Sequence, residues 1–544
     1  MFGQMMDRPL LISQLIEFSA RYHGDTEIVT RTVEGPIHRY GYADAHERIK
    51  QLANALTRRG IKLGDRVATL AWNTHRHFEL YFGISGIGAV CHTLNPRLFA
   101  DQLEYIINHA GDRLIFADAM FEPILANLKG KMAPVEGIVF MTDRENMPET
   151  ELENVMCYEE FIGAEGADFD WPEFDERTAS SLCYTSGTTG HPKGALYSHR
   201  STMLHTFSIC GAESFGLSSA QVFLPVVPMF HANAWGIPYG CAMTGTKIVM
   251  PGARMEGDKI FEMLDKEDVT FAAGVPTVWL MLLDEMKKQG RKPNALKSML
   301  VGGSAVARSM IETFERDYGL EVFHAWGMTE MSPVGTNGRL SHKMSNLPRE
   351  KQWDIKAKQG RAMFGVEIKI VDDEGKRLPE DGEAFGEVLV RGPWIASGYF
   401  ANEEATKAAL DDEGWFRTGD VATLDPQGVM QIVDRSKDVI KSGGEWISSI
   451  DLENAALGHP DVAHAAVIGV AHPKWDERPL LIVVPEEGKS PKSDEIIEYL
   501  KDKIAKWWLP DDVQFVDEIP LTATGKISKL DLRKRFADYK LPTA

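Results

Sequence analysis

Cysteine is scarce in this sequence, and long apolar runs are missing from it. The 544 residues include five cysteines, an odd number with no Cys-x-x-Cys pair. A disulfide framework or a structural zinc site requires paired or closely spaced cysteines, so the sequence argues against both. No stretch approaches the roughly 18 uninterrupted apolar residues of a spanning helix, and Asp7, Arg8 and Glu17 interrupt the first twenty residues. We therefore expect a soluble protein of the reducing cytoplasm, without a membrane span.

Positive charge is also in deficit. The 59 Lys and Arg residues face 79 Asp and Glu residues, which gives a formal net charge of −20. Such an acidic chain offers no general nucleic-acid-binding surface, so a site for an anionic ligand must be a local basic pocket. The length exceeds what one compact core holds, at about 100 to 200 residues per domain, and predicts several lobes or domains.

One segment combines glycine, hydroxyl and lysine side chains at high density. Residues 184–194 read Tyr-Thr-Ser-Gly-Thr-Thr-Gly-His-Pro-Lys-Gly, and residues 179–184 have the composition of a strand leading into them. Glycines let backbone N–H groups turn toward an anion, hydroxyls add neutral donors, and a lysine supplies positive charge. The segment therefore predicts a polyphosphate cradle. Its residues are Thr185, Ser186, Gly187, Thr188, Thr189, Gly190 and Lys193.

A flexible surface loop is the alternative interpretation of this segment, and without Lys193 the two interpretations would be equally good. The spacing is not that of the Walker phosphate loop, because Pro192 precedes the lysine and Gly194 follows it. A mononucleotide kinase is therefore disfavoured. A second group of glycines at 83, 86 and 88 does not follow the dinucleotide-binding order, and close helix packing explains it better.

The chain resembles the adenylate-forming superfamily, which comprises acyl-CoA synthetases, adenylation domains of peptide synthetases and luciferases. The resemblance covers nearly the whole sequence. Besides the cradle it rests on seven ordered segments, at residues 228–233, 302–304, 326–330, 414–420, 434–438, 441–445 and 524–526. Examples are Trp-Gly-Met-Thr-Glu at 326–330, Asp-Arg-Ser-Lys-Asp at 434–438 and Thr-Gly-Lys at 524–526.

The order of strand-like and helix-like runs predicts an α/β fold. Strand-like runs at 66–70, 247–250 and 298–301 alternate with helical patterns at 259–266 and 307–318. We expect a large N-terminal domain of layered α/β subdomains with a β-rich lobe from about residue 366, and a small mobile α+β C-terminal domain with a helix at 493–506. The predicted boundaries are 1–434, a hinge at 435–437, and 438–544. A homodimer is expected by analogy only.

The resemblance implies an ATP-dependent acid–CoA ligase with ATP, Mg²⁺ and CoA as its ligands. A carboxylate is a poor electrophile, and attack on the α-phosphate of ATP converts it into an acyl-adenylate with loss of pyrophosphate. A thiol then takes the acyl group and releases AMP. Such catalysis depends mainly on positioning and charge stabilisation.

Roles in the ATP site follow from the resemblance. Glu330 is the expected Mg²⁺ ligand, helped by Thr185, because Mg²⁺ prefers oxygen ligands. Taken alone, Glu330 is more often a surface or capping residue, Asp420 a turn residue and Arg435 a solvated charge. The resemblance assigns Asp420 to the ribose hydroxyls, with Arg435 beside it. The other expected nucleotide-site residues are Gly303, Ser304, His324, Ala325, Trp326, Gly327, Met328, Thr329 and Ile432.

Lys526 is the expected catalytic lysine, able to reach both the acid and the α-phosphate from a loop. A lone lysine is usually a solvated charge, and only the adjacent Thr-Gly distinguishes this one. Leu521 follows Pro520 where the family usually has arginine or lysine. The resemblance makes Lys437 the hinge about which the small domain turns. The loop expected to line the CoA tunnel comprises Lys441, Gly443, Gly444, Glu445 and Trp446, for which a simple turn is the alternative.

His231 stands where amino-acid-activating relatives have aspartate, which disfavours an amino acid as substrate. It is expected to pack beside the acid carboxylate, and a core histidine is the alternative. Trp235, one helical turn later, would shorten the acyl pocket or simply belong to the core. The expected substrate-contacting residues are His231, Trp235, Gly302, Gly303, Trp326 and Gly327.

Residues 226–236 resemble the medium-chain branch, and especially 3-methylthiopropanoate–CoA ligases. A short or medium acyl acid is therefore expected, with 3-methylthiopropanoate favoured. An aryl or long-chain acid ligase is the nearest alternative, and a luciferase-like oxygenase is a weaker one. A phosphotransferase would release ADP instead of AMP. A noncatalytic nucleotide-binding protein would form no AMP in response to an acid.

Overall fold

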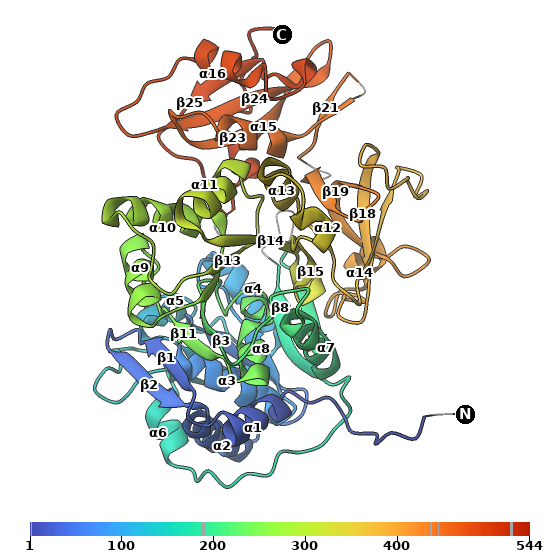
Figure 1. Cartoon of the computed structure of the whole chain (residues 1–544). Coiled ribbons are helices and arrows are strands. Elements are labelled where there is room, and N and C mark those ends of the chain that lie inside the picture. The colour runs from blue at the N-terminus through green and yellow to red at the C-terminus, as the bar shows by residue number, and fades with distance from the viewer. Residues whose placement is uncertain (2, 186–190, 436–437, 444, 523–525) are drawn as a thin grey trace.

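Two large β-sheets, both mostly parallel, form the first part of the chain (Figure 1). The computed structural model describes residues 1, 3–185, 191–435, 438–443, 445–522 and 526–544. The larger sheet has nine strands in the order β16-β15-β14-β13-β12-β10-β11-β1-β2. Their bounds are β1 Glu27–Arg31, β2 Ile37–Gly41, β10 Val222–Pro225, β11 Lys247–Met250, β12 Phe271–Gly274, β13 Ser298–Val301, β14 Glu321–Gly327, β15 Val334–Asn337 and β16 Arg361–Ala362.

The second sheet has seven strands in the order β7-β6-β5-β3-β4-β8-β9. Their bounds are β3 Arg66–Leu70, β4 Val90–Thr93, β5 Asp112–Ala117, β6 Gly137–Phe140, β7 Val155–Cys157, β8 Ala179–Tyr184 and β9 Gly194–Ser198. Helix α3 (His75–Gly86) contacts β3 and β4 of this sheet and β1 of the other, and all its residues are buried. The helix is therefore enclosed on every side, and its buried polar residues, among them Arg76, His77 and Glu79, need partners inside the protein.

Two smaller sheets complete the chain. Antiparallel strands β17 Glu367–Val371, β18 Phe385–Arg391, β19 Phe416–Leu424 and β20 Met430–Arg435 form a separate four-stranded sheet. The C-terminal part, at the top of Figure 1, has the order β22-β21-β24-β23 with β25 beside β24. These strands are β21 Ile440–Ser442, β22 Glu445–Ile447, β23 Val462–His472, β24 Asp476–Pro485 and β25 Asp512–Phe515.

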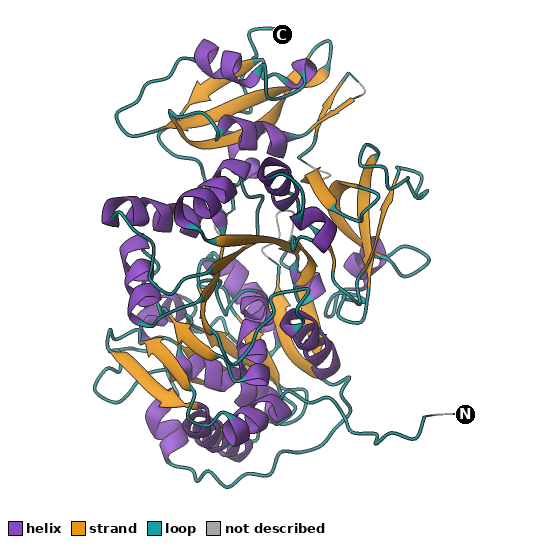
Figure 2. Ribbon diagram, in the orientation of Figure 1, coloured by secondary structure: helices purple, strands orange, loops and turns teal. Residues whose placement is uncertain are grey.

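Helices cover the faces of these sheets (Figure 2). In α9, for example, the buried residues Ile260, Phe261, Met263 and Leu264 follow helical spacing and pack on the larger sheet's core. The remaining helices are α1 Ser13–Tyr22, α2 Tyr42–Arg58, α4 Ala100–Ala110, α5 Glu122–Asn127, α6 Tyr158–Gly163, α7 His199–Cys210, α8 Ile237–Thr244, α9 Gly257–Lys266, α10 Pro276–Gln289, α11 Arg308–Tyr318, α12 His342–Ser345, α13 Arg349–Lys356, α14 Glu403–Ala409, α15 Ser449–Ala456, α16 Ser493–Leu500 and α17 Lys529–Arg535.

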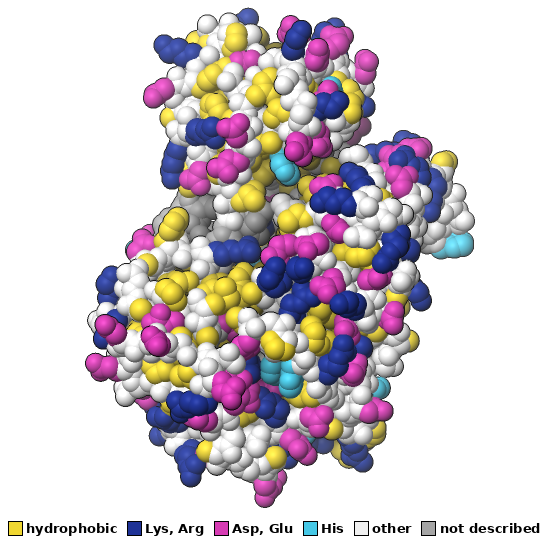
Figure 3. Space-filling model, turned by 90° about the vertical axis from the view of Figure 1, so that its left-hand side faces the viewer, with side chains coloured by type: hydrophobic (Ala, Val, Ile, Leu, Met, Phe, Trp, Pro, Cys, Tyr) yellow, Lys and Arg dark blue, Asp and Glu magenta, His cyan; other side chains and the backbone are white. Residues whose placement is uncertain are grey.

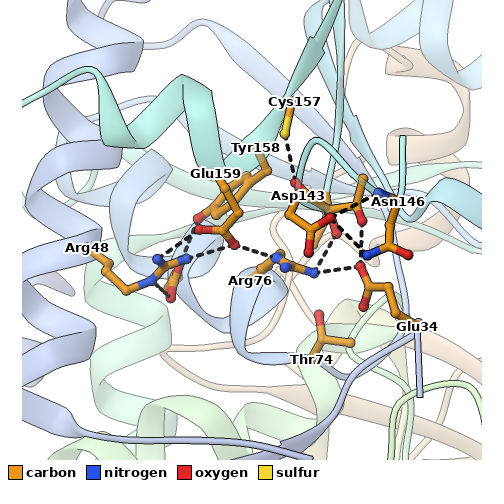
Figure 4. A network of polar contacts seen from close by, with 12 residues as sticks. Glu34, Arg48, Thr74, Arg76, Asp143, Asn146, Cys157, Tyr158 and Glu159 are labelled. Carbon is orange, nitrogen blue, oxygen red and sulfur yellow. Dashed lines mark hydrogen bonds and ion pairs between the residues drawn. The ribbon is translucent and has the colours of Figure 1, made fainter. Parts of the chain in front are cut away.

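A buried network of charges ties α2, α3 and α6 together (Figure 4). Glu79 is fully buried and accepts hydrogen bonds from Arg48 at 2.7 and 3.2 Å and from the Tyr158 hydroxyl at 2.6 Å. Arg48 also donates to Glu159, which in turn accepts from Arg76. Each charged side chain named in this network has a partner of opposite charge. That is the condition under which ionised groups are tolerated in a protein interior.

The predicted α/β class is correct, and one predicted helix is too long. The helix expected at 493–506 ends at Leu500, where residues 501–503 form a turn. Ile504, Trp507 and Trp508 pack on the C-terminal core, so the chain leaves the helical direction to bury them. The packing explanation for the glycines at 83 and 86 is confirmed, because an added Cβ would meet Leu52 at 2.5 Å and Trp171 at 2.4 Å. Gly88 instead lies in a turn with φ of 81°.

Candidate active site

A cavity of about 1190 Å³ lies where the C-terminal domain meets the rest of the chain. Figure 3 shows the surface hollowed between these two parts, on the side that faces left in Figure 1. Fifteen of the residues predicted from the sequence line this cavity. They are Thr185, Lys193, His231, Trp235, Gly302, Gly303, Ser304, Ala325, Trp326, Gly327, Met328, Thr329, Glu330, Arg435 and Lys526.

The predicted phosphate cradle connects two antiparallel strands, β8 and β9. Its two ends are closed by hydrogen bonds from the Thr185 N–H to the Lys193 carbonyl at 2.9 Å and from the Lys193 N–H to the Thr185 hydroxyl at 3.3 Å. The ammonium of Lys193 lies 5.1 Å from the centre of the Tyr399 ring, within the range of a cation–π interaction. The other cradle residues, at 186–190, lie outside the described residues.

Glu330 offers a carboxylate to the same cavity as Thr185 and Lys193. The Tyr399 hydroxyl donates to its Oε1 at 2.6 Å. Burial raises the pKa of Glu330, and the Tyr399 hydrogen bond and the nearby Arg435 and Lys193 charges oppose this. A carboxylate and a hydroxyl are the oxygen donors that Mg²⁺ prefers, so the residues present fit the expected ion.

Trp326, Asp420 and Arg435 form a chain of polar contacts beside the cavity. The Trp326 indole N–H donates to Asp420 Oδ2 at 2.8 Å, and Arg435 Nε lies 2.7 Å from Asp420 Oδ1. Asp420 is only 2% exposed. Each of its carboxylate oxygens already has a partner, so a ribose hydroxyl would use the lone pair that each oxygen retains. The contacts orient the Trp326 ring at the cavity wall.

Lys526 reaches the cavity from the C-terminal domain. An added Cβ on Gly303 would lie 3.9 Å from the Cε of Lys526, so the lysine side chain passes over the glycine turn. Burial, together with the positive charge of Arg435, lowers the pKa of Lys526 to about 8, although Asp420 and Glu330 act in the opposite direction. The lysine is therefore charged at neutral pH but close to its titration.

This lowered pKa predicts an alkaline limit to the first half-reaction. In the role predicted for it, the charged lysine stabilises negative charge, so activity should be full well below pH 8 and fall as the pH rises through about 8. An unperturbed lysine, with a pKa of about 10.4, would titrate two units later. The measurement is kcat/KM for ATP in acid-dependent pyrophosphate exchange from pH 6 to 10. Lys526→Arg should lack the limb near pH 8, and a wild-type profile flat to pH 10 would contradict the assignment.

His231 and Trp235 line the part of the cavity next to Gly302 and Gly303. Burial, and then the Lys526 charge, lowers the pKa of His231 to about 4, so its ring is neutral at pH 7. An added Cβ on Gly302 would meet the Trp235 ring at 2.9 Å. The indole therefore lies directly against the glycine turn and forms part of the cavity wall there. The cavity as a whole exceeds the short pocket predicted, because it also includes the nucleotide site and the interdomain cleft.

The segment that carries Trp235 is not the α-helical turn expected from the spacing. Ala232, Asn233, Ala234 and Trp235 have φ values of 45°, 52°, 49° and 59°, a left-handed turn before α8. Asn233 anchors this turn by donating to the Ser181 hydroxyl at 2.9 Å and accepting from the Cys183 thiol. The left-handed turn nevertheless brings His231 and Trp235 to the same cavity.

Several predicted residues do not line the cavity. His324 is buried on β14, where its Nδ1 lies 3.1 Å from the Ala357 carbonyl oxygen and burial lowers its pKa to about 4. Ile432 lies on β20, and its N–H donates to Gln359 at 2.5 Å. Asp420 supports the wall from behind, as described above. Of the predicted CoA-loop residues, Lys441 lies on β21 and Gly443 follows it, and neither is among the described residues that line the cavity. Lys437 and Gly444 lie outside the described residues.

Comparison with known protein families identifies the family to which this chain belongs. The family model for AMP-binding enzymes matches residues 16–400, and that for the AMP-binding enzyme C-terminal domain matches residues 451–526. The chain belongs to the AMP-binding enzyme family. The predicted adenylate-forming assignment is therefore confirmed.

Curated relatives of this AMP-binding enzyme match over almost their whole length. A 3-methylmercaptopropionyl-CoA ligase from Ruegeria lacuscaerulensis is 52% identical over 99% of both chains. A medium-chain-fatty-acid–CoA ligase from Ectopseudomonas oleovorans is 47% identical over 99% of this chain and 98% of its own. The predicted class, an AMP-forming acid–CoA ligase, is confirmed by these relatives.

A solved anthranilate CoA ligase in complex with anthranoyl-AMP has the same fold, with a TM-score of 0.87 at 22% identity over 98% of this chain and 99% of its own. This match confirms the large N-terminal and small C-terminal arrangement. Among the described helices, none is long and apolar enough to cross a membrane.

Tyr399, Asp434 and Lys529 were missed by sequence reasoning in this AMP-binding enzyme. Tyr399 contacts both Glu330 and Lys193, and the other two form a contact described below. The signal for Tyr399 was weak, since it is a single aromatic residue after a glycine. Asp434 was treated only as a boundary, and Lys529 as one of several lysines near the C-terminus.

Proposed function

We propose that this AMP-binding enzyme joins a short or medium carboxylic acid, with 3-methylthiopropanoate favoured, to CoA at the expense of ATP. The observation that carries the proposal is the convergence of three cations, Lys526, Lys193 and Arg435, on a cavity that His231 and Trp235 also line. Cations surround the place for phosphates, and an apolar ring faces the place for an acyl chain. The names of the two relatives agree with that substrate range.

The first half-reaction follows from charge and position. The acid carboxylate attacks the α-phosphorus of ATP, the bond to the β-phosphate oxygen breaks, and pyrophosphate leaves. Lys526 stabilises the negative charge of the acid and α-phosphate, while Lys193 holds the departing phosphates. Glu330 and Thr185 would hold Mg²⁺, which neutralises phosphate charge when bound. The neutral His231 ring would orient the acid without adding charge.

The second half-reaction forms a C–S bond between the acyl carbon and the CoA thiol and releases AMP. In the proposed cycle the C-terminal domain turns about Lys437, withdraws Lys526 and brings the loop at 441–446 to the CoA path. The division into residues 1–434, 435–437 and 438–544 serves this movement. A homodimer in the cytoplasm completes the proposal.

A thioether acid suits the part of the cavity that Trp235 and Gly302 line. Trp235 lies against Gly302, and Trp326 lines the same wall, so a short chain would contact indole rings. Sulfur–aromatic contacts contribute about 0.3 to 1.5 kcal/mol, which favours 3-methylthiopropanoate over a hydrocarbon chain of equal length.

The proposal is tested by AMP release from purified protein with ATP, Mg²⁺ and CoA. The panel should contain 3-methylthiopropanoate, linear acids of about four to ten carbons, a branched acid and an aromatic acid. We expect acid-dependent AMP and pyrophosphate, with the highest kcat/KM for 3-methylthiopropanoate or a medium-chain acid. ADP as the product, or preference for an aryl acid, would overturn it.

Trp235→Ala should move the preference toward longer acids. Removing the indole opens space beside Gly302, and each methylene that enters an apolar pocket changes discrimination by about 1 to 3 kcal/mol. The ratio of kcat/KM for octanoate to that for 3-methylthiopropanoate should rise at least about tenfold. The KM for ATP serves as the control and should stay near the wild-type value. An unchanged chain-length profile would remove Trp235 from the substrate wall.

A further inference from the structure

Lys529 lies at the start of α17 in a contact that crosses the domain boundary. Its ammonium is 3.0 Å from Glu453 Oε1 and 3.9 Å from Asp434 Oδ1, and it donates to the Ser449 hydroxyl. The side chains of Lys529, Glu453 and Asp434 are 10%, 11% and 2% exposed. Glu453 and Ser449 lie on α15 of the C-terminal domain, whereas Asp434 lies on β20 before the predicted hinge.

Asp434 receives further donors from the other side of the boundary. The Ser449 N–H donates to its Oδ2 at 3.1 Å, and the Ser449 hydroxyl donates to the same oxygen. Next to it, the Ser448 hydroxyl donates to the Val433 carbonyl at 2.6 Å. A buried carboxylate is tolerated only with such partners, so Asp434 favours the domain orientation that supplies them.

The contact connects directly to Lys526 along the chain. Lys526 precedes Lys529 by three residues, and its N–H donates to the Thr522 hydroxyl at 3.2 Å. The Ser528 N–H donates to the Pro520 carbonyl at 2.8 Å, and the Ser528 hydroxyl caps α17 by accepting from the Asp531 N–H. Fixing Lys529 therefore restrains residues 526–528, the adjoining segment that begins with Lys526.

On the other side, Asp434 connects to the nucleotide site. It is followed by Arg435, whose N–H donates to Asp434 Oδ1 at 2.8 Å and whose guanidinium pairs with Asp420. Asp420 in turn accepts from the Trp326 indole. A continuous series of contacts thus runs from the cavity wall through Asp434 to the segment that carries Lys526.

We propose that Asp434 and Lys529 are positioning residues that hold Lys526 at the cavity during adenylate formation. The inference rests on the proposed function, because it assigns the first half-reaction to Lys526. Both residues line the interdomain part of the cavity, and the proposed role requires no contact of either with the substrate. Their contact sets where the catalytic ammonium lies, and a misplacement of about 1 Å costs about 10²-fold in rate.

Lys529→Met provides the first test, since it removes the charge and keeps most of the length. The rate constant for 3-methylthiopropanoyl-adenylate formation should fall by roughly tenfold to 10²-fold in single-turnover pyrophosphate release. Thioester formation from supplied 3-methylthiopropanoyl-adenylate should change by less than about threefold. Lys529→Arg should restore the first rate, because it renews the charged contact.

Lys534→Met is the matched control. It removes the same charge from the same helix, but its side chain is 69% exposed and, among the described residues, its ion-pair partner is Asp531 at 3.4 Å. Neither half-reaction should change. Asp434→Asn is the second variant, for use if Lys529→Met does not fold. It leaves the Lys529–Glu453 pair intact. It should also slow adenylation selectively.

The outcomes separate this inference from the proposed function. If wild-type protein shows no acid-dependent pyrophosphate release, the proposed function fails. If Lys526→Ala loses that release while folded Lys529→Met and Asp434→Asn keep wild-type adenylation, only the positioning role fails. Equal losses in both half-reactions would also overturn it, because they indicate general damage to the domain.

Discussion

Lys526→Ala should slow adenylate formation by about 10² to 10³, the scale for losing one preorganised charge-stabilising donor. The ammonium crosses from the C-terminal domain to the cavity that also contains Lys193 and Arg435. Neither of these cations replaces it, because Arg435 is paired with Asp420 and Lys193 lies over the Tyr399 ring. The measurement is single-turnover pyrophosphate release with 3-methylthiopropanoate.

Thioester formation from supplied adenylate serves as the internal control for this variant. In the proposed cycle Lys526 has left the cavity by then, so the second rate should be much less affected. An equal loss in both steps would contradict the division of labour between the two orientations. Unchanged adenylation would show that the lysine is only a solvated charge.

Arg48→Met should cost about 3 to 5 kcal/mol in the free energy of unfolding of the N-terminal region, the range for breaking a buried ion pair by removing one partner. Arg48 forms two hydrogen bonds with the fully buried Glu79 and two more with Glu159 (Figure 4). Without it, the partners that Glu79 keeps within the described part of the chain are two tyrosine hydroxyls, Tyr40 at 3.0 Å and Tyr158 at 2.6 Å. A lower urea midpoint for tertiary fluorescence would report the loss.

Arg144→Met is the control for this prediction. Arg144 pairs with Glu160, but its side chain is 68% exposed and that of Glu160 is 49% exposed. Exposed pairs contribute little, so its urea midpoint should match that of the wild type. A shift as large as that of Arg48→Met would mean that burial does not decide the effect. An unchanged midpoint for Arg48→Met would show that the network rearranges around Glu79.

The strands that form the sheet interiors could be predicted because burial on both faces gives short apolar runs. The runs at 66–70, 247–250 and 298–301 coincide with β3, β11 and β13. The cradle at 184–194 was recognisable for a related reason, since its chemistry is local in sequence. Helix α16 was overextended because the signal that ends it, the burial of Trp507 and Trp508, acts through tertiary packing.

The candidate site shows the same division between local and tertiary information. Glu330 and Lys526 stand in short motifs that can be read directly. Tyr399, which donates to Glu330, and Glu453, which pairs with Lys529, lie in segments without a motif, and only the fold brings each to its partner. Asp420 was assigned to a ligand with Arg435 nearby, but the sequence did not indicate that the Trp326 indole and the Arg435 guanidinium each contact one of its oxygens.

The left-handed turn at 232–235 limits how the pocket can diversify. Valine, isoleucine and threonine are strongly disfavoured at positive φ, so positions 232, 234 and 235 accept mainly unbranched or very small side chains. Evolution or engineering of new acid preferences at Trp235 must therefore proceed by changing bulk or polarity, and not by introducing a branched aliphatic wall. Glycine is the one replacement that would relax the backbone as well, at the expense of a fixed boundary for the acyl chain.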